Sequence, residues 1–145
     1  MLALLQRVKH ANVAVDNKVI GEIQHGLLVF IGVEKEDSTK NADRLLERVL
    51  GYRIFSDKND RMNLNVQEVN GGLLLIPQFT LAADTKKGMR PSFTPAAAPL
   101  LGKTLFDEIM QSAREKHPTV AQGQFGAYMQ ITLCNDGPVT FLLKS

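Results

Sequence analysis

The chain has 145 residues and a formal net charge of only +2, with 17 Lys and Arg against 15 Asp and Glu. A chain of this length suggests a single domain, residues 1–145, that can bury a sizeable core. The near balance of charge does not by itself indicate nucleic-acid binding, which would need local clusters of Lys and Arg.

Cys134 is the only cysteine, so an internal disulfide is excluded and a reducing compartment is expected. The apolar run at the N-terminus is too short for a secretory signal. No segment approaches the roughly 18 apolar residues that a membrane helix needs. We therefore expect a soluble, cytoplasmic protein that does not bind membranes.

The first third of the chain predicts β-structure. Residues 1–8 and 12–15 are two short apolar runs, and Asp16-Asn17 supplies turn chemistry before a third strand at residues 18–23. Gly26 then opens a continuous apolar run through residue 33, which is typical of a strand buried on both faces.

Two amphipathic helices are expected to cover a sheet. The first should begin after an N-cap at Ser38 or Thr39 and end at Gly51. The second should run from about residue 95 to residues 116–118. Both have apolar residues at helical spacing. These are Ala42, Leu45, Leu46, Val49 and Leu50 in the first helix, and Leu101, Leu105, Phe106, Ile109, Met110 and Ala113 in the second.

Gly71-Gly72 introduces another buried strand at residues 73–76, which ends in Pro77-Gln78-Phe79-Thr80-Leu81. Polar Gln78 and Thr80 therefore lie at a strand exit, where sheet proteins commonly display functional groups. The segment 82–95 has too many breakers for regular structure. It carries three basic residues, Lys86, Lys87 and Arg90.

Residues 125–134 alternate apolar and polar, which predicts a strand with Phe125 and Met129 on one face. A Gly137-Pro138 turn follows, and residues 139–143 predict the closing strand. Pro138 has no backbone donor, and Gly137 leaves its carbonyl open to another molecule. Such a turn is most often a simple strand connection. Together the elements predict a mixed-sheet α/β domain.

The usual catalytic constellations are absent. His10, His25 and His117 have no second ligand at metal-binding spacing, so we expect surface or structural histidines and no metal site. Cys134 is predicted to be an inert, buried thiol in an apolar strand. Thr80 is the one hydroxyl at a promising strand end, but no adjacent base is visible to activate it. An active site here would therefore work with backbone groups.

Two long motifs resemble those of the D-aminoacyl-tRNA deacylases. The first is Gln78-Phe79-Thr80-Leu81-Ala82-Ala83-Asp84-Thr85, followed by Gly88-Met89-Arg90-Pro91-Ser92-Phe93. The second is Asn135-Asp136-Gly137-Pro138-Val139-Thr140. The segments 5–8, 48–57 and 62–65 also resemble the family. The likeness spans nearly the whole chain, and two motifs about fifty residues apart make it specific.

The resemblance implies a homodimer of a three-layer β/β/α fold that hydrolyses the ester between a D-amino acid and the terminal adenosine of tRNA. The Gly137-Pro138 peptide would be cis and would enter the partner's active site. Its two carbonyls would lie where an L side chain must point, which rejects L substrates by collision. Glycine mischarged on tRNA would be a second substrate. Arg7 would support the Gly-Pro motif.

The resemblance also assigns the remaining site residues. Gln78, Phe79 and Thr80 would surround the scissile ester with backbone N–H groups poised for the oxyanion. The 2′-hydroxyl of the tRNA would help activate water, without metal or organic cofactor; Thr80 as a nucleophile is the alternative. Phe125, by stacking, and Met129 would hold the adenine. Lys86, Lys87 and Arg90 either contact tRNA phosphates or form a solvated loop.

One departure from the family pattern is Pro77, where the family usually has serine. Proline removes a hydroxyl and an N–H group and favours extended geometry at Ile76. Because the strand is extended anyway, we expect the activity to survive. The rival interpretations are a tRNA- or nucleotide-binding dimer that has lost catalysis, to which only Pro77 points, and a structural dimer without a nucleic-acid role.

Overall fold

The sheet is assembled around a 14-residue strand, β1 (Leu2–Val15). On one edge, β1 pairs first with β3 (Gly26–Gly32) and then with β2 (Lys18–Ile23); on the other edge it pairs with β8 (Gln130–Lys144). Residues 1–8 and 12–15 are therefore parts of one strand, because the exposed residues between them keep their backbone pairing: His10 lies opposite Cys134.

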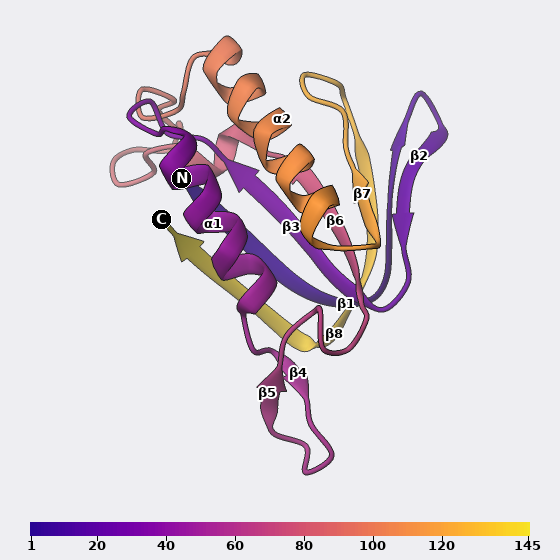
Figure 1. Ribbon diagram of the computed structural model, residues 1–145. Helices are drawn as coiled ribbons and strands as arrows, with labels where there is room; N and C mark the ends of the chain where they lie inside the picture. Colours follow the sequence, from indigo (N-terminus) through magenta and orange to yellow (C-terminus); the bar gives the residue numbers. More distant parts are fainter.

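The sheet has the order β2-β1-β3-β6-β7, with β8 paired to β1 (Figure 1). Strands β6 (Gly72–Pro77) and β7 (Val120–Gln122) run parallel to β3, whereas β1 is antiparallel to it. Each parallel step needs a crossover, and the right-handed crossover rule puts both helices on the same face. Figure 1 shows α1 and α2 side by side in front of the sheet.

Helix α1 (Thr39–Gly51) confirms the predicted bounds and buried stripe. Its N-cap is Ser38, whose N–H donates to Asn41 Oδ1 at 3.0 Å. Helix α2 (Pro99–Lys116) begins four residues later than predicted. The preceding segment stays extended because its backbone is already engaged: Pro95 O accepts from Lys35 N–H at 3.0 Å, and Ala97 N–H donates to Val33 O at 2.9 Å.

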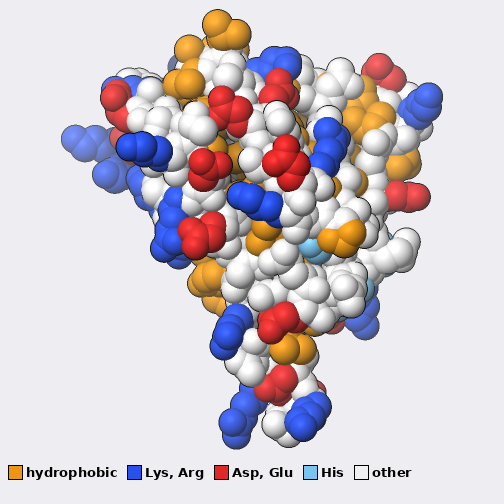
Figure 2. All heavy atoms as spheres, in the orientation of Figure 1, with side chains coloured by type: hydrophobic (Ala, Val, Ile, Leu, Met, Phe, Trp, Pro, Cys, Tyr) orange, Lys and Arg blue, Asp and Glu red, His pale blue; other side chains and the backbone are white.

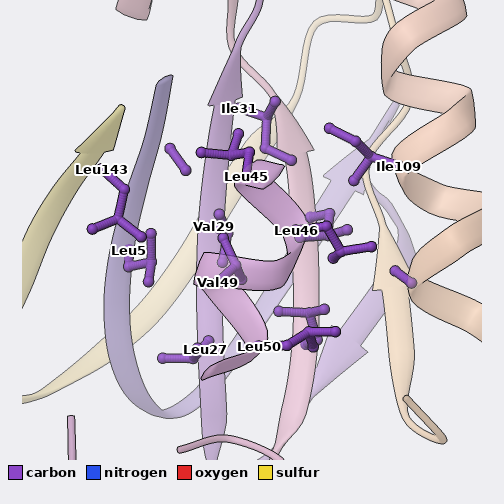
Figure 3. Packing of buried hydrophobic residues seen from close by; sticks show 14 of the residues in the cluster. Leu5, Leu27, Val29, Ile31, Leu45, Leu46, Val49, Leu50, Ile109 and Leu143 are labelled. Carbon is purple, nitrogen blue, oxygen red and sulfur yellow. The ribbon is translucent and has the colours of Figure 1, made fainter. Parts of the chain in front are cut away.

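Two hydrophobic clusters define three layers. The larger cluster lies between the helices and the sheet, where the α1 side chains face Leu27, Val29 and Ile31 of β3 (Figure 3). The smaller one lies on the opposite face, where β2 curls over β6 and β7 and the first half of β8 packs inward. It contains Val8, Ala11, Val13, Ile23, Leu28, Leu74 and Ile76. The β/β/α prediction is confirmed, in a sheet that is nearly barrel-like.

The C-terminal third differs from the prediction in four ways, of which the last concerns the Gly137-Pro138 segment. Residues 125–129 form a turn rather than strand, because Gly126 adopts a positive φ of 76° and interrupts the extended backbone. Strand β7 was not predicted. Cys134 is exposed rather than buried, since Leu133 takes the inward face of β8 and its neighbour must point outward.

The Gly137-Pro138 segment is not a turn between two strands. Val8 pairs with Asn135 and Gln6 pairs with Thr140, so the four residues 136–139 of β8 lie opposite the single residue Arg7. Both halves of β8 pair with the same strand in the same direction. The segment is therefore a large bulge, of four residues opposite one, in a single long strand.

A short hairpin, β4 (Phe55–Ser56) and β5 (Met62–Leu64), projects from one end of the molecule (Figure 1). Its tip is ordered by Asp57, whose Oδ1 accepts the N–H groups of Asn59 and Arg61 at 2.8 and 3.1 Å. These bonds hold the pKa of Asp57 below its ordinary value. Neither helix has the length and apolarity to cross a membrane.

The two ends of the chain meet at an ion-pair cluster. The buried Met1 amine donates to Glu34 Oε2 at 3.0 Å and to Asp37 Oδ1 at 2.6 Å, and Lys144 Nζ lies 3.2 Å from Glu34 Oε1. Partial burial raises the pKa of Glu34, but the hydrogen bonds and charges of the Met1 amine and Lys144 outweigh burial, and the net pKa is lowered.

The pKa of Glu34 is lower in the folded state than in the unfolded chain, so ionised Glu34 stabilises the fold at a pH above its ordinary pKa. This stabilisation is lost as the pH falls through the folded-state pKa. Because Glu34 stays partly exposed to solvent, which screens its ion pairs, Glu34→Gln should lower the free energy of unfolding by about 1 kcal/mol at pH 7. The deficit should shrink below about pH 4. Urea unfolding across this range measures it, with exposed Glu36→Gln as the control. A deficit independent of pH would contradict the assignment.

Candidate active site

The exit of β6 forms a tight turn with two open backbone donors. Gln78 N–H donates to Ile31 O at 2.8 Å, and the 3-10 helix Phe79–Ala82 follows. The first bond of this helix runs from Leu81 N–H to Gln78 O at 3.2 Å. The N–H groups of Phe79 and Thr80 precede that bond and have no acceptor within the turn. Of the three predicted backbone donors, Gln78 is thus already committed to the sheet.

The Thr80 side chain has an amide as its neighbour rather than a base. Gln78 Nε2 donates to Thr80 Oγ1 in a short hydrogen bond. An amide N–H cannot accept a proton, so this contact orients the hydroxyl without activating it as a nucleophile. Pro77 closes β6 opposite Ile31, beyond the part of the strand that pairs with β7.

Two adjoining cavities flank this turn. Both are lined by Pro77, Gln78, Phe79 and Gly126. The first, of about 290 Å³, lies between the sheet and α2; the second, of about 260 Å³, lies toward the start of β8. Most residues that line the two cavities are hydrophobic, and the polar Gln78 lines both. This combination is expected of a small-molecule site.

The structure brings Phe125 and Met129 to these cavities from the turn before β8. Phe125 lines the first cavity and packs on α2 at Gly102, where an added Cβ would lie 3.3 Å from the ring. Met129 lines the second, and its Sδ accepts Gln124 N–H at 3.3 Å. Because the two residues sit on a turn rather than on one strand face, they line different cavities.

The bulge of β8 rests on Arg7. Its Nε donates to Asp136 O at 3.0 Å and lies 3.5 Å from Asp136 Oδ2. Its Nη1 donates to Ile54 O at 2.6 Å, at the base of the β4–β5 hairpin. The side chain is only 12% exposed. Arg7 therefore ties the bulge to the hairpin, and it lies away from the two cavities.

Asn135 is a residue that the sequence reasoning missed. Its Oδ1 accepts Val139 N–H at 2.7 Å, and its Nδ2 donates to Val139 O at 3.2 Å and to Thr140 Oγ1 at 3.1 Å. One amide thus closes the bulge from both sides. An Asn before a Gly-Pro pair was the available signal, because Asn side chains commonly bond the backbone of a turn.

Gly137 and Pro138 lie exposed at the crest of the bulge, and the peptide bond between them is cis. Gly137 has a φ of 148°, and an added Cβ would lie 2.5 Å from Val139 Cγ2. Only glycine fits this position without displacing its neighbours.

Within one chain, the bulge and the strand exit lie far apart. Arg7, beside the bulge, is level with Leu27 and Leu73, whereas Pro77 is level with Ile31, four residues further along β3. With about 3.3 Å per residue and about 4.8 Å between strands, the crest and the cavities are separated by roughly 20 Å measured along the sheet surface across β8-β1-β3-β6. The predicted site residues therefore form two separate groups.

The three basic residues lie in the exposed loop after the 3-10 helix. Two backbone bonds between Asp84 and Ser92, at 2.8 and 2.9 Å, close this loop. Lys86, Lys87 and Arg90 are exposed and form no ion pair within the chain. Figure 2 shows Lys and Arg side chains gathered along the left edge of the molecule, where Figure 1 draws the loop.

Of the three histidines, His10 is exposed on β1, and the other two have packing or hydrogen-bond partners. His117 is buried, with Nε2 2.7 Å from Gly71 O, and His25 packs edge-on against Phe55. No group of three or more His, Cys, Asp or Glu side chains is arranged to hold a metal ion.

Comparison with known proteins gives one consistent family. The family model described as D-Tyr-tRNA(Tyr) deacylase matches residues 4–144. A protein of Legionella pneumophila (strain Corby), named D-aminoacyl-tRNA deacylase, is 55% identical over 144 residues, which cover 99% of both chains. The protein of that name from Stutzerimonas stutzeri (strain A1501) is 54% identical over 145 residues and all of both chains.

Solved structures agree on the fold. The c-Myc DNA Unwinding Element Binding Protein superposes with a TM-score of 0.96 at 32% identity, covering 100% of this chain and 99% of that one. A probable eukaryotic D-amino acid tRNA deacylase superposes with a TM-score of 0.84 at 18% identity, covering 99% and 98%. Since the family model and the relatives cover the chain almost from end to end, this protein belongs to the D-aminoacyl-tRNA deacylase family.

Proposed function

We propose that this enzyme edits tRNA: it hydrolyses the ester of D-aminoacyl-tRNA to free D-amino acid and tRNA, and it rejects the L-aminoacyl form. The observation that carries this proposal is the pair of open backbone donors at Phe79 and Thr80, where Phe79 lines both cavities and the Thr80 hydroxyl has no general base in contact. We infer that the reaction takes place in the cytoplasm, where charged tRNA is used, and needs no metal or organic cofactor.

The first cavity and the neighbouring 3-10 helix take different parts of the substrate. The terminal adenine stacks on Phe125 in the first cavity, since an aromatic ring packed firmly on a helix gives a rigid stacking surface. Met129 limits the space beyond the turn. The ester carbonyl then lies over the 3-10 helix, where the Phe79 and Thr80 N–H groups stabilise the oxyanion that forms when water attacks. The 2′-hydroxyl of the adenosine helps to activate that water.

Selectivity comes from a second copy of the chain. The Gly137-Pro138 crest is exposed and lies roughly 20 Å from the cavities of its own chain, so in a homodimer it is available to the partner's site. Leu142, exposed on the second half of β8, supplies apolar surface for this association. The crest carbonyls then occupy the space that an L side chain would need.

The same arrangement admits glycine. Glycine has no side chain to collide with the crest. Glycine mischarged on tRNA(Ala) is therefore a second substrate. A D side chain points away from the crest and is accepted. Lys86, Lys87 and Arg90 contact phosphates of the tRNA, because they are exposed and lack acidic partners within the chain.

The deciding experiment compares D-Tyr-tRNA with L-Tyr-tRNA. We expect release of free amino acid from the D ester at least about 100-fold faster than from the L ester, after subtraction of spontaneous hydrolysis. Binding of both substrates without release would favour the rival interpretation, a tRNA-binding dimer that has lost catalysis.

Asn135→Ala removes the amide that closes the bulge. The crest should become mobile, and the preference for D-Tyr-tRNA over L-Tyr-tRNA should fall about tenfold or more, mainly through faster cleavage of the L ester. Asn135→Asp keeps the acceptor for Val139 N–H, so its preference for the D ester should lie between those of the unmutated protein and Asn135→Ala. Equal losses on the D and L esters would mean that Asn135 acts only on stability.

Thr80→Val tests the role of the hydroxyl. If backbone donors and the substrate's 2′-hydroxyl carry the reaction, the rate constant on D-Tyr-tRNA should fall less than tenfold. Loss of a true nucleophile costs on the order of 10⁶-fold in a serine hydrolase. A D-Tyr-tRNA substrate with a 2′-deoxy terminal adenosine should instead lose most of its reactivity, and the opposite pattern would restore Thr80 as the nucleophile.

A further inference from the structure

Two exposed phenylalanines lie side by side at the mouth of the site. The rings of Phe79 and Phe93 have centroids 5.2 Å apart at an angle of 54°. Phe79 is 58% exposed and Phe93 is 42% exposed. Large apolar rings that remain this open in a folded chain commonly mark a contact with another molecule. Phe93 has no role in the reaction described above.

The loop of residues 84–93, which we call the basic loop, connects the turn that carries Phe79 to Phe93. The residues between the two rings close on themselves through the Asp84–Ser92 backbone bonds, and Ser92 Oγ lies 3.0 Å from Thr94 Oγ1. Phe93 is therefore fixed immediately after a closed loop. The loop carries three basic side chains and one acid, Asp84, whose Oδ1 accepts the N–H of Lys86 at 3.0 Å. Rings and positive charge thus occupy one small area.

Phe79 connects this area to the proposed substrate cavities, because it lines both of them. A terminal adenosine bound there is attached through its 5′-phosphate to a preceding, unpaired nucleotide. Phe79 is exposed at this edge of the cavities and its ring lies 5.2 Å from that of Phe93, so a nucleotide that leaves the cavities on this side meets Phe93 and the basic loop next.

We propose that Phe79 and Phe93 form a stacking platform for the base of the nucleotide that precedes the terminal adenosine, while the basic loop neutralises the phosphate between the two nucleotides. This subsite rests on the proposed function. It would hold the single-stranded 3′ tail at two bases rather than one. The combination of an aromatic surface with positive charge is how proteins bind single-stranded nucleic acid without reading its sequence.

The charge argues for a nucleotide over an apolar protein partner. Counting residues 84–93, three positive side chains against one negative give a net charge of +2 (3 − 1). An apolar partner would gain nothing from this charge, whereas a phosphate does. Stacking on an aromatic ring is worth roughly tenfold to a hundredfold in affinity per base.

The first test measures stacking without catalysis. A short RNA that ends in the tRNA 3′ tail, with 2-aminopurine in place of the base before the terminal adenosine, is titrated with the protein. Stacking should quench its fluorescence. Phe93→Leu should remove the quenching and weaken binding about tenfold, and Phe93→Tyr should restore both. Leu100→Ala removes another exposed apolar side chain, 79% exposed, and serves as the matched control. Thermal unfolding verifies that each variant is folded.

The second test uses the reaction. For the unmutated protein, D-Tyr-tRNA with an abasic nucleotide before the terminal adenosine should have a KM about tenfold higher than that of intact D-Tyr-tRNA. With Phe93→Leu, removal of the base should change nothing further. A Phe93→Leu effect that is equal for intact and abasic substrates would overturn the platform and give the ring a structural or dimer-contact role. Quenching without deacylation would uphold the platform and overturn the proposed function.

Discussion

Strand β1 uses both of its edges along most of its length, and this double pairing sets the position of the bulge relative to the strands that carry the cavities. On one edge it passes from β3 to β2, which forces the sheet to curl. On the other edge it pairs with the two halves of β8, which fixes the bulge opposite Arg7. The groups that the proposed reaction needs are thus set by strand register, with few of them on freely moving side chains.

This arrangement is consistent with the proposed reaction, which uses little acid–base chemistry from side chains. The β6 strand ends where its last backbone partner, Ile31, accepts the Gln78 N–H. The chain then enters a 3-10 turn whose first donors are left open. These donors are fixed by the sheet and need no reorganisation when charge develops, which is the condition under which backbone N–H groups stabilise an oxyanion well. The Gln78–Thr80 side-chain bond stiffens the same turn.

Local signals in the sequence predicted most elements. The apolar stripe, the Ser38 N-cap and Gly51 defined α1 closely, because all three act within a few residues. Alternation alone misled at residues 125–129, where Gly126 turns the backbone, and at Cys134, whose face depends on the register of β8. The start of α2 depended on backbone bonds to Val33 and Lys35, distant in sequence, which no local pattern encodes.

The site shows the same division. Gln78 and Thr80 at a strand exit, and an open Gly137 carbonyl, followed from local chemistry. The bulge did not, because it exists only in relation to β1, whereas the bonds of Asn135 to Val139 and Thr140 are local and had a signal in the sequence. The separation between crest and cavities likewise required the full register of four strands.

That separation makes selectivity, in the proposed dimer, a property of the assembly rather than of either chain. A chain with a damaged crest would keep an intact cavity and would still cleave only the D ester there, because the partner's crest enters that cavity. The partner's cavity would instead receive the damaged crest and would no longer exclude L substrates. In a cell that makes both forms, mixed dimers would hydrolyse correctly charged L-aminoacyl-tRNA at one of their two sites. A crest mutation would then act as a gain of harmful activity, dominant over the normal copy, whereas a damaged cavity would act as a simple loss.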